Sequence, residues 1–227
     1  MPPHEGQALF TAGAAISNTG HVVLMLHGRG ASPQDILGLV PHLDCPAATY
    51  LAPAAANRTW YPLSFLSEIS RNEPDLSSAL CVVEQIVQDC EQRGIKRDRI
   101  VLLGFSQGAC LAAEFAVRHP GRWGGVVVFS GGLIGPPGTT WDTTGDFAGT
   151  PVFLGCSDVD AHIPKTRVEE SAVVFSRMGA DVTTRIYPGM GHTVNDDEIE
   201  HARKMLKSIA QQKETGSSQY SKEDPVS

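Results

Sequence analysis

The stretch Arg99-IVLLGFSQGACLAAEFAV-Arg118 decides the fold. Its first part is a continuous apolar run, which is typical of a parallel strand covered on both faces. The part from Gln107 onward is rich in alanine and stops before His119-Pro120, which predicts a short helix. Between them Gly104-Phe105-Ser106-Gln107-Gly108 matches the G-x-S-x-G pattern, in which a sharp strand-to-helix turn exposes a serine hydroxyl. The sequence therefore predicts that Ser106 is a nucleophile at the carboxyl end of a strand, at the top of the sheet.

Strand-like and helix-like segments alternate along the rest of the chain. Short apolar runs predict strands, and apolar residues at three- and four-residue steps predict helices. Their alternation favours an α/β fold: one mostly parallel sheet with helices on both faces and a ligand site at the carboxyl ends of the strands. The predicted strands are 21–27, 48–53, 99–104, 125–130, 151–155 and 182–187, and the predicted helices are 76–90, 107–118, 168–178 and 199–209.

Composition excludes several classes of protein. The 227 residues carry 18 Lys and Arg against 25 Asp and Glu, a net charge of −7, which argues against nucleic acid or an anionic membrane as a partner. The first basic residue is Arg29 and the apolar runs are too short for a bilayer, so we expect no targeting signal and no membrane span. Five cysteines without C-x-x-C spacing are typical of reduced thiols in a cytoplasmic protein.

The organisation of the chain is simple. We expect a single domain over residues 1–210, followed by a polar, disordered tail over residues 211–227, which carries little to bury. Two long segments, 57–74 and 133–150, contain aromatic residues but no clean periodicity. Long irregular loops of this kind are often lids or binding loops, and packed surface loops are the alternative.

A serine nucleophile needs a base, and the base needs an orienting acid. In α/β-hydrolases they follow the serine in the order Asp, His. Of the eight histidines, only His192 and His201 lie beyond the fifth and sixth predicted strands. His192 falls in a glycine-flanked turn after the last strand, whereas His201 falls inside the final helix. We therefore expect His192 to be the base.

The acid should come from the loop that follows the fifth predicted strand. The segment Pro151-VFLGCSDVDAHI-Pro164 offers two candidates, and we favour Asp158, three residues past Gly155, over Asp160. Asp158, Asp160 and His162 are also types of metal ligand. No second cluster supports a metal site, however, and turn-forming aspartates are the commoner explanation. We expect neither a metal nor a cofactor.

Acyl transfer also needs N–H donors for the negative charge that develops on the carbonyl oxygen. The backbone N–H of Gln107, the residue after the nucleophile, is one expected donor. The second should come from Leu26-HGRGA-Ser32, which follows an early strand and whose glycines can turn amides toward the site. A plain glycine-rich turn is the alternative, and the segment does not continue into a phosphate-binding pattern.

Together these motifs resemble the phospholipase/carboxylesterase family of α/β-hydrolases. The resemblance covers residues 20–210 and rests on LHGRG, GFSQGA, GCSDVDAHIP and GMGHTVND in this order. It implies an α/β-hydrolase fold without a large cap domain. The implied residues are Ser106, Asp158 and His192 for the triad, the amides of Arg29 and Gln107 for the oxyanion hole, and Trp60, Tyr61 and Phe65 for the substrate pocket.

The implied activity is that of a serine carboxylesterase. It would hydrolyse short- to medium-chain esters of small molecules, or thioesters, through an acyl-enzyme, with no nucleic acid or membrane partner; a homodimer is an open option. Acyl-protein thioesterases usually read HGLGD where this chain has HGRGA, and their acid loop is shorter. Both differences favour a smaller ester. The alternatives are a non-catalytic ligand-binding protein on this fold, a dienelactone-hydrolase-like enzyme and an acyl-protein thioesterase.

Overall fold

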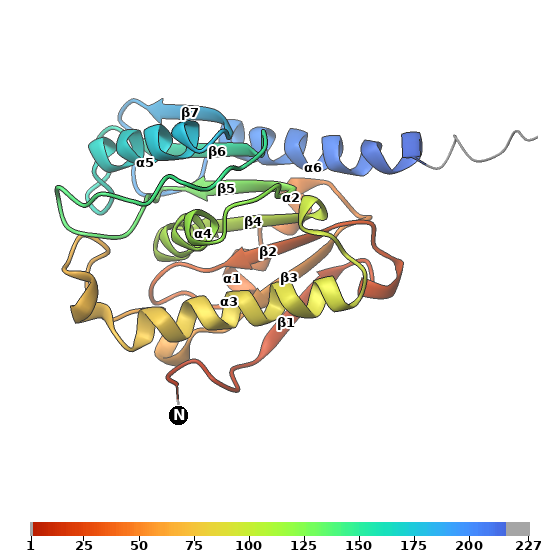
Figure 1. The fold of residues 1–227 in the computed structure, drawn as a ribbon, viewed down its shortest axis with the longest axis horizontal. Helices are drawn as coiled ribbons and strands as arrows, with labels where there is room; N and C mark the ends of the chain where they lie inside the picture. The colour runs from red at the N-terminus through yellow and green to blue at the C-terminus, as the bar shows by residue number, and fades with distance from the viewer. Residues whose placement is uncertain (1, 217–227) are drawn as a thin grey trace, which may run out of the picture.

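One twisted sheet runs through the molecule (Figure 1). The computed structural model describes residues 2–216, with side chains for residues 2–211 apart from residue 18. Within this part, seven strands form the sheet in the order β1-β3-β2-β4-β5-β6-β7, and β1 alone runs antiparallel to its neighbour. The strands are β1 (Leu9–Gly13), β2 (Val22–Leu26), β3 (Thr49–Pro53), β4 (Ile100–Phe105), β5 (Gly125–Phe129), β6 (Pro151–Ser157) and β7 (Asp181–Tyr187).

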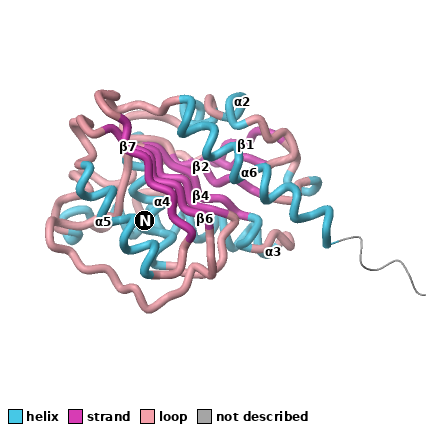
Figure 2. Tube along the Cα trace, turned by 90° about the horizontal axis from the view of Figure 1, so that it is seen from above, coloured by secondary structure: helices cyan, strands magenta, loops and turns pink. Residues whose placement is uncertain are grey.

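Helices cover both faces of the sheet (Figure 2). Side chains that alternate along the strands feed two hydrophobic cores, one shared with α3, α4 and α5 and the other with α1, α2 and α6. This doubly covered arrangement explains why the central strands read as continuous apolar runs. The helices are α1 (Pro33–Leu37), α2 (Val40–Leu43), α3 (Asp75–Gln92), α4 (Gln107–Arg118), α5 (Lys165–Arg177) and α6 (Asp196–Gly216), with 3-10 turns at Ile16–Asn18, Ala56–Arg58, Ile69–Asn72 and Arg97–Arg99.

The α/β-hydrolase fold predicted from the sequence is confirmed, and no helix or strand interrupts the described chain between β5 and β6, where a cap could have been inserted. Three elements were missed. β1 lies at the edge of the sheet with mostly exposed residues, so it shows no apolar run. α1 and α2 have five and four residues, which is too short for a helical stripe to be recognised.

The predicted tail is wrong at its beginning. α6 continues to Gly216, so residues 211–216 extend the last helix, and the rest of the predicted tail lies outside the described residues. α6 begins three residues before the predicted helix, at Asp196, directly after Asn195. Asn195 Oδ1 accepts a hydrogen bond from the Glu198 amide at 2.9 Å, and Glu198 Oε2 accepts one from the Asn195 amide at 2.9 Å. This reciprocal cap fixes the chain just after the loop that carries His192.

Candidate active site

The turn between β4 and α4 holds Ser106 in a backbone conformation that few residues adopt. Its φ is 54° and its ψ is −118°, and such a conformation costs about 1 to 3 kcal/mol unless the surroundings enforce it. The flanking glycines allow this enforcement. A Cβ at Gly104 would collide with the backbone of Gly108, and a Cβ at Gly108 would collide with the carbonyl of Leu26. The G-x-S-x-G spacing therefore lets β2, β4 and α4 approach closely enough to hold the serine out of the sheet.

His192 lies directly against this serine. The turn after β7 places its Nε2 2.8 Å from Ser106 Oγ, although 86 residues separate the two in sequence. The ring packs against Phe105, with centroids 4.9 Å apart, and against His162, also at 4.9 Å. His201 lies elsewhere, in α6, where its ring stacks on Phe153 of β6. The expected pairing of Ser106 with His192 is present in the structure.

The acid beside His192 is Asp160 and not Asp158, so the favoured sequence prediction is wrong. Asp160 Oδ2 lies 2.7 Å from His192 Nδ1. Asp158 instead turns toward the loop after β7, where its Oδ1 accepts a hydrogen bond from the Gly189 amide at 2.8 Å. β6 ends at Ser157, so Asp158 is the first residue after the strand. Asp160 comes two residues later, where the chain has turned back toward His192.

The Asp160 carboxylate is fixed on both oxygens. Oδ1 accepts hydrogen bonds from the amides of His162 at 2.8 Å and Ile163 at 3.0 Å, and the side chain is fully buried. Burial alone would raise the pKa of Asp160, but the bonds from His192 and from these two amides outweigh it and hold the pKa below its usual value. The acid is therefore ionised at neutral pH and can only accept, which places a proton on His192 Nδ1 and leaves Nε2 free to accept from Ser106.

The local sequence carries a signal for Asp160 that the spacing argument passed over. An aspartate whose carboxylate accepts the amides two and three residues later forms an Asx-type turn. In Asp160-Ala161-His162-Ile163 this turn locks the carboxylate in place. Asp158 makes no such turn, and its carboxylate is exposed.

The two candidate oxyanion donors come from the two loops next to the serine. Gln107 is the first residue of α4, where a helix has amide groups without an acceptor in the preceding turn. Arg29 follows Gly28, at which a Cβ would lie 3.5 Å from the Cβ of Ser106, so the two loops nearly touch. The Gln107 side chain also ties the aromatic loop to this point, accepting from the Trp60 amide at 2.9 Å and donating to the Tyr61 carbonyl at 2.7 Å.

A cavity of about 550 Å³ opens onto Ser106 and His192. Tyr61 and Phe65 line it, as predicted, together with Arg29, Cys110, His162 and Ile163. Burial raises the pKa of Cys110 to about 12, so this thiol stays protonated and packs in the wall. The prediction that Trp60 lines the pocket is wrong. Trp60 is fully buried behind the wall and donates its Nε1–H to the His27 carbonyl at 2.9 Å.

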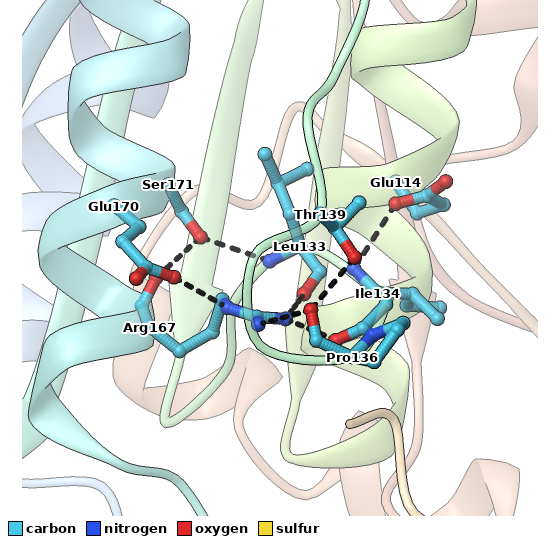
Figure 3. Close-up of polar contacts among 9 residues, drawn as sticks. Glu114, Leu133, Ile134, Pro136, Thr139, Arg167, Glu170 and Ser171 are labelled. Carbon is cyan, nitrogen blue, oxygen red and sulfur yellow. Dashed lines mark hydrogen bonds and ion pairs between the residues drawn. The ribbon is translucent and has the colours of Figure 1, made fainter. Parts of the chain in front are cut away.

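The predicted long loop 133–150 is fastened to the domain at its beginning. Figure 3 shows the buried Arg167 of α5 reaching the carbonyls of Leu133 and Pro136, at 2.8 and 3.2 Å. The Glu114 carboxylate of α4 accepts from the Ile134 amide at 3.1 Å, and the Ser171 hydroxyl accepts from the Leu133 amide at 2.9 Å. Since buried charges are costly unless they are paired in this way, the first part of the loop is held against α4 and α5 and does not act as a lid.

Metal binding finds no support in this geometry. Among residues 2–216, no group of three or more His, Cys, Asp and Glu side chains is arranged to hold a metal ion. Asp160, the central member of the conceivable cluster, is already engaged by His192 and two amides. Over the same residues, no helix combines the length and the apolar character that crossing a membrane requires.

The sheet topology, the strained serine turn and the histidine after the last strand together define an α/β-hydrolase. Residues 12–210 match the family model described as Phospholipase/Carboxylesterase. The chain belongs to the phospholipase/carboxylesterase family and is an ester hydrolase of the serine type.

Similar proteins agree in fold and in class. A crystal structure of a phospholipase/carboxylesterase from Dyadobacter fermentans superposes with a TM-score of 0.86 at 38% identity and covers 91% of this chain and 99% of that one. Acyl-protein thioesterase 1 of Eremothecium gossypii is 31% identical over 184 residues, 78% of this chain and 75% of that protein. The putative hydrolase MhqD of Bacillus subtilis is 27% identical over 192 residues, 82% of this chain and 92% of that protein.

Proposed function

We propose that this chain is a serine esterase that cleaves short- to medium-chain carboxylic esters with Ser106, His192 and Asp160 as its triad. One observation carries the proposal: an unbroken path of 2.8 Å from Ser106 Oγ to His192 Nε2 and 2.7 Å from His192 Nδ1 to Asp160 Oδ2, at the mouth of a cavity. A nucleophile, a base and an orienting acid within hydrogen-bond distance are the parts that acyl transfer needs.

The chemistry proceeds in two halves. Ser106 Oγ attacks the ester carbonyl carbon while His192 Nε2 takes the serine proton. The amides of Gln107 and Arg29 receive the charge that develops on the carbonyl oxygen, and each such donor is worth about 3 kcal/mol in the transition state. His192 gives the proton to the departing alcohol, and the acyl group stays on Ser106. Water then attacks the acyl-enzyme by the same route and releases the acid.

The cavity wall favours acyl chains of limited length. The rings of Tyr61 and Phe65 are almost fully buried and occupy the wall next to the nucleophile. These rings offer apolar surface to an alkyl chain of limited length, while Arg29, Ser64 and Gln107 contribute polar groups to the same lining. A thioester is the second candidate substrate, because a relative that shares 31% identity with this chain is named acyl-protein thioesterase 1. The same triad would expel a thiol in place of an alcohol.

The test is the removal of the nucleophile. Ser106→Ala should lower kcat for p-nitrophenyl acetate by about 10⁴-fold or more and abolish labelling by a fluorophosphonate. Ser176→Ala, an exposed serine of α5, serves as the matched control and should keep both. A Ser106→Ala protein that folds normally and still turns over the ester would overturn the assignment. Butanoyl and dodecanoyl esters, each as the oxygen ester and the thioester, then define chain length and leaving group.

A further inference from the structure

The cavity beside Ser106 has an unusual charge for this protein. The chain as a whole carries a net charge of −7. The lining of the cavity nevertheless contains Arg29, His162 and His192 and, among the residues that the structure describes there, neither an aspartate nor a glutamate. Asp160 lies close by, but its side chain is fully buried and engaged with His192. Arg29 therefore gives this surface a positive charge that no carboxylate of the lining opposes, although the molecule as a whole is negative.

Arg29 supplies this charge. Its Nη1 donates to the Pro62 carbonyl at 2.8 Å and to Thr59 Oγ1 at 3.3 Å, and its Nη2 donates to the Leu63 carbonyl at 2.6 Å. All three acceptors are neutral. Within residues 2–211, no carboxylate lies within ion-pair distance of this guanidinium. The charge is thus held in a fixed place and is not neutralised by the protein.

The guanidinium also has N–H donors that these three hydrogen bonds do not use. An arginine has five N–H donors in a planar fork, of which these three hydrogen bonds use three. The remaining two suit the two oxygens of a carboxylate, with which arginine forms short, charge-assisted pairs. The guanidinium carbon lies 5.9 Å from the centre of the Tyr61 ring, a wall residue of the same cavity. Arg29 is therefore placed at the wall that a substrate would touch.

We propose that the enzyme prefers esters that carry a carboxylate, and that Arg29 selects them. The inference rests on the proposed function, since it assigns the substrate class of the same site. The favoured substrates are half-esters of small dicarboxylic acids or esters of carboxylate-bearing alcohols, according to which half of the ester occupies the cavity. A hydrocarbon acyl chain brings no negative charge to Arg29, whereas a carboxylate supplies one.

A purely structural role for Arg29 makes a different prediction. If its three bonds serve only to hold segment 59–63, the loss of the side chain would impair every ester alike. If Arg29 binds the substrate, its replacement would lower kcat/KM for the anionic ester more than for the neutral one. The ratio of kcat/KM for an anionic ester to that for its neutral methyl ester separates the two roles, because loop damage cancels in the ratio.

Two matched pairs of substrates test the proposal and locate the carboxylate. In the first pair, p-nitrophenyl adipate is compared with p-nitrophenyl methyl adipate, so the charge is in the acyl half. In the second, 4-(hexanoyloxy)benzoate is compared with its methyl ester, so the charge is in the leaving group. Each ratio is measured for the native protein and for Arg29→Met, Arg29→Lys and Arg122→Met. Arg122 precedes β5 at the opposite end of the sheet and donates to the Ala148 carbonyl at 3.3 Å.

The expected result is a preference of about tenfold for the anionic member of at least one pair, a size typical of one charge-assisted contact near the surface. Arg29→Met should bring that ratio close to one, and Arg29→Lys should retain part of it. Arg122→Met, which removes the same charge elsewhere, should leave the ratio unchanged. Raising the salt from about 20 to about 300 mM should reduce the preference of the native protein, because screening weakens an exposed charge pair.

Two outcomes would overturn the inference: no preference for the anionic ester in either pair, or a preference that survives in Arg29→Met. In the second outcome both members of a pair lose activity equally in Arg29→Met, and Arg29 then only positions the loop. The proposed function fails in a different way. In that case the native protein hydrolyses none of the four esters, or Ser106→Ala hydrolyses them as fast as the native protein does.

Discussion

Replacing Asp160 by asparagine reverses one hydrogen bond and leaves its neighbours in place. The carbonyl oxygen of the introduced side chain can occupy the position of Oδ1, where two backbone amides donate to it at 2.8 and 3.0 Å. The amide nitrogen then takes the position of Oδ2, 2.7 Å from His192 Nδ1. An NH₂ group donates, so His192 must accept at Nδ1 and carry its proton on Nε2. In this tautomer the ring cannot take the proton of Ser106.

The expected loss in kcat for Asp160→Asn is about 10⁴-fold. The same inversion of the histidine tautomer has this effect in serine protease triads, and at 1.36 kcal/mol for each factor of ten it equals about 5.4 kcal/mol of transition-state stabilisation. The variant should still fold, because both backbone bonds to residue 160 are kept. The rate of fluorophosphonate labelling of Ser106 should fall with kcat, since both reactions need the base.

Asp158→Asn is the matched control, two residues away. In the native protein the Gly189 amide donates a hydrogen bond to Asp158 Oδ1 at 2.8 Å, and an asparagine side-chain oxygen can accept the same bond. The side chain is also exposed, so the substitution disturbs no packing. We therefore expect kcat to stay within about threefold of the native value. Initial rates with p-nitrophenyl acetate and a thermal melt of each protein provide the comparison. The reasoning would be refuted if folded Asp160→Asn kept more than a tenth of kcat, or if Asp158→Asn lost as much.

Three further variants test the cavity wall and the cap of α6. Trp60→Ala should lower the free energy of unfolding by about 3 to 5 kcal/mol and leave the acyl-chain preference unaltered, whereas Phe65→Ala should shift kcat/KM toward longer esters; the opposite pattern would return Trp60 to the pocket. Burial raises the pKa of Glu198 to about 7 from 4.5, so the folded protein binds this proton more tightly than the unfolded chain and gains about 1.4 kcal/mol between pH 8 and pH 6. Urea titrations at both pH values should show this gain missing in Glu198→Gln, and equal gains in both proteins would contradict it.

Patterns confined to a few neighbouring residues could be interpreted from the sequence alone. The apolar runs of the central strands reflect burial on both faces, and the glycines around Ser106 reflect contacts that any larger residue would break. His192 was found because it is a histidine in a turn after the last strand. These features reside in composition and spacing, so the α/β-hydrolase fold and two members of the site followed from them.

Tertiary structure decided between residues that the sequence left equivalent. Asp158 and Asp160 are the same residue type in the same loop, and only the return of the chain after β6 brings one of them to His192, 32 residues away. Trp60 and Phe65 share an aromatic segment, yet the Gln107 side chain holds the Trp60 backbone so that its ring turns into the core. Distances between residues far apart in sequence depend on how the loops fold back onto the sheet. Local sequence patterns do not encode how the loops fold back. The tertiary structure therefore decided which aspartate is the acid and which aromatic residues line the pocket.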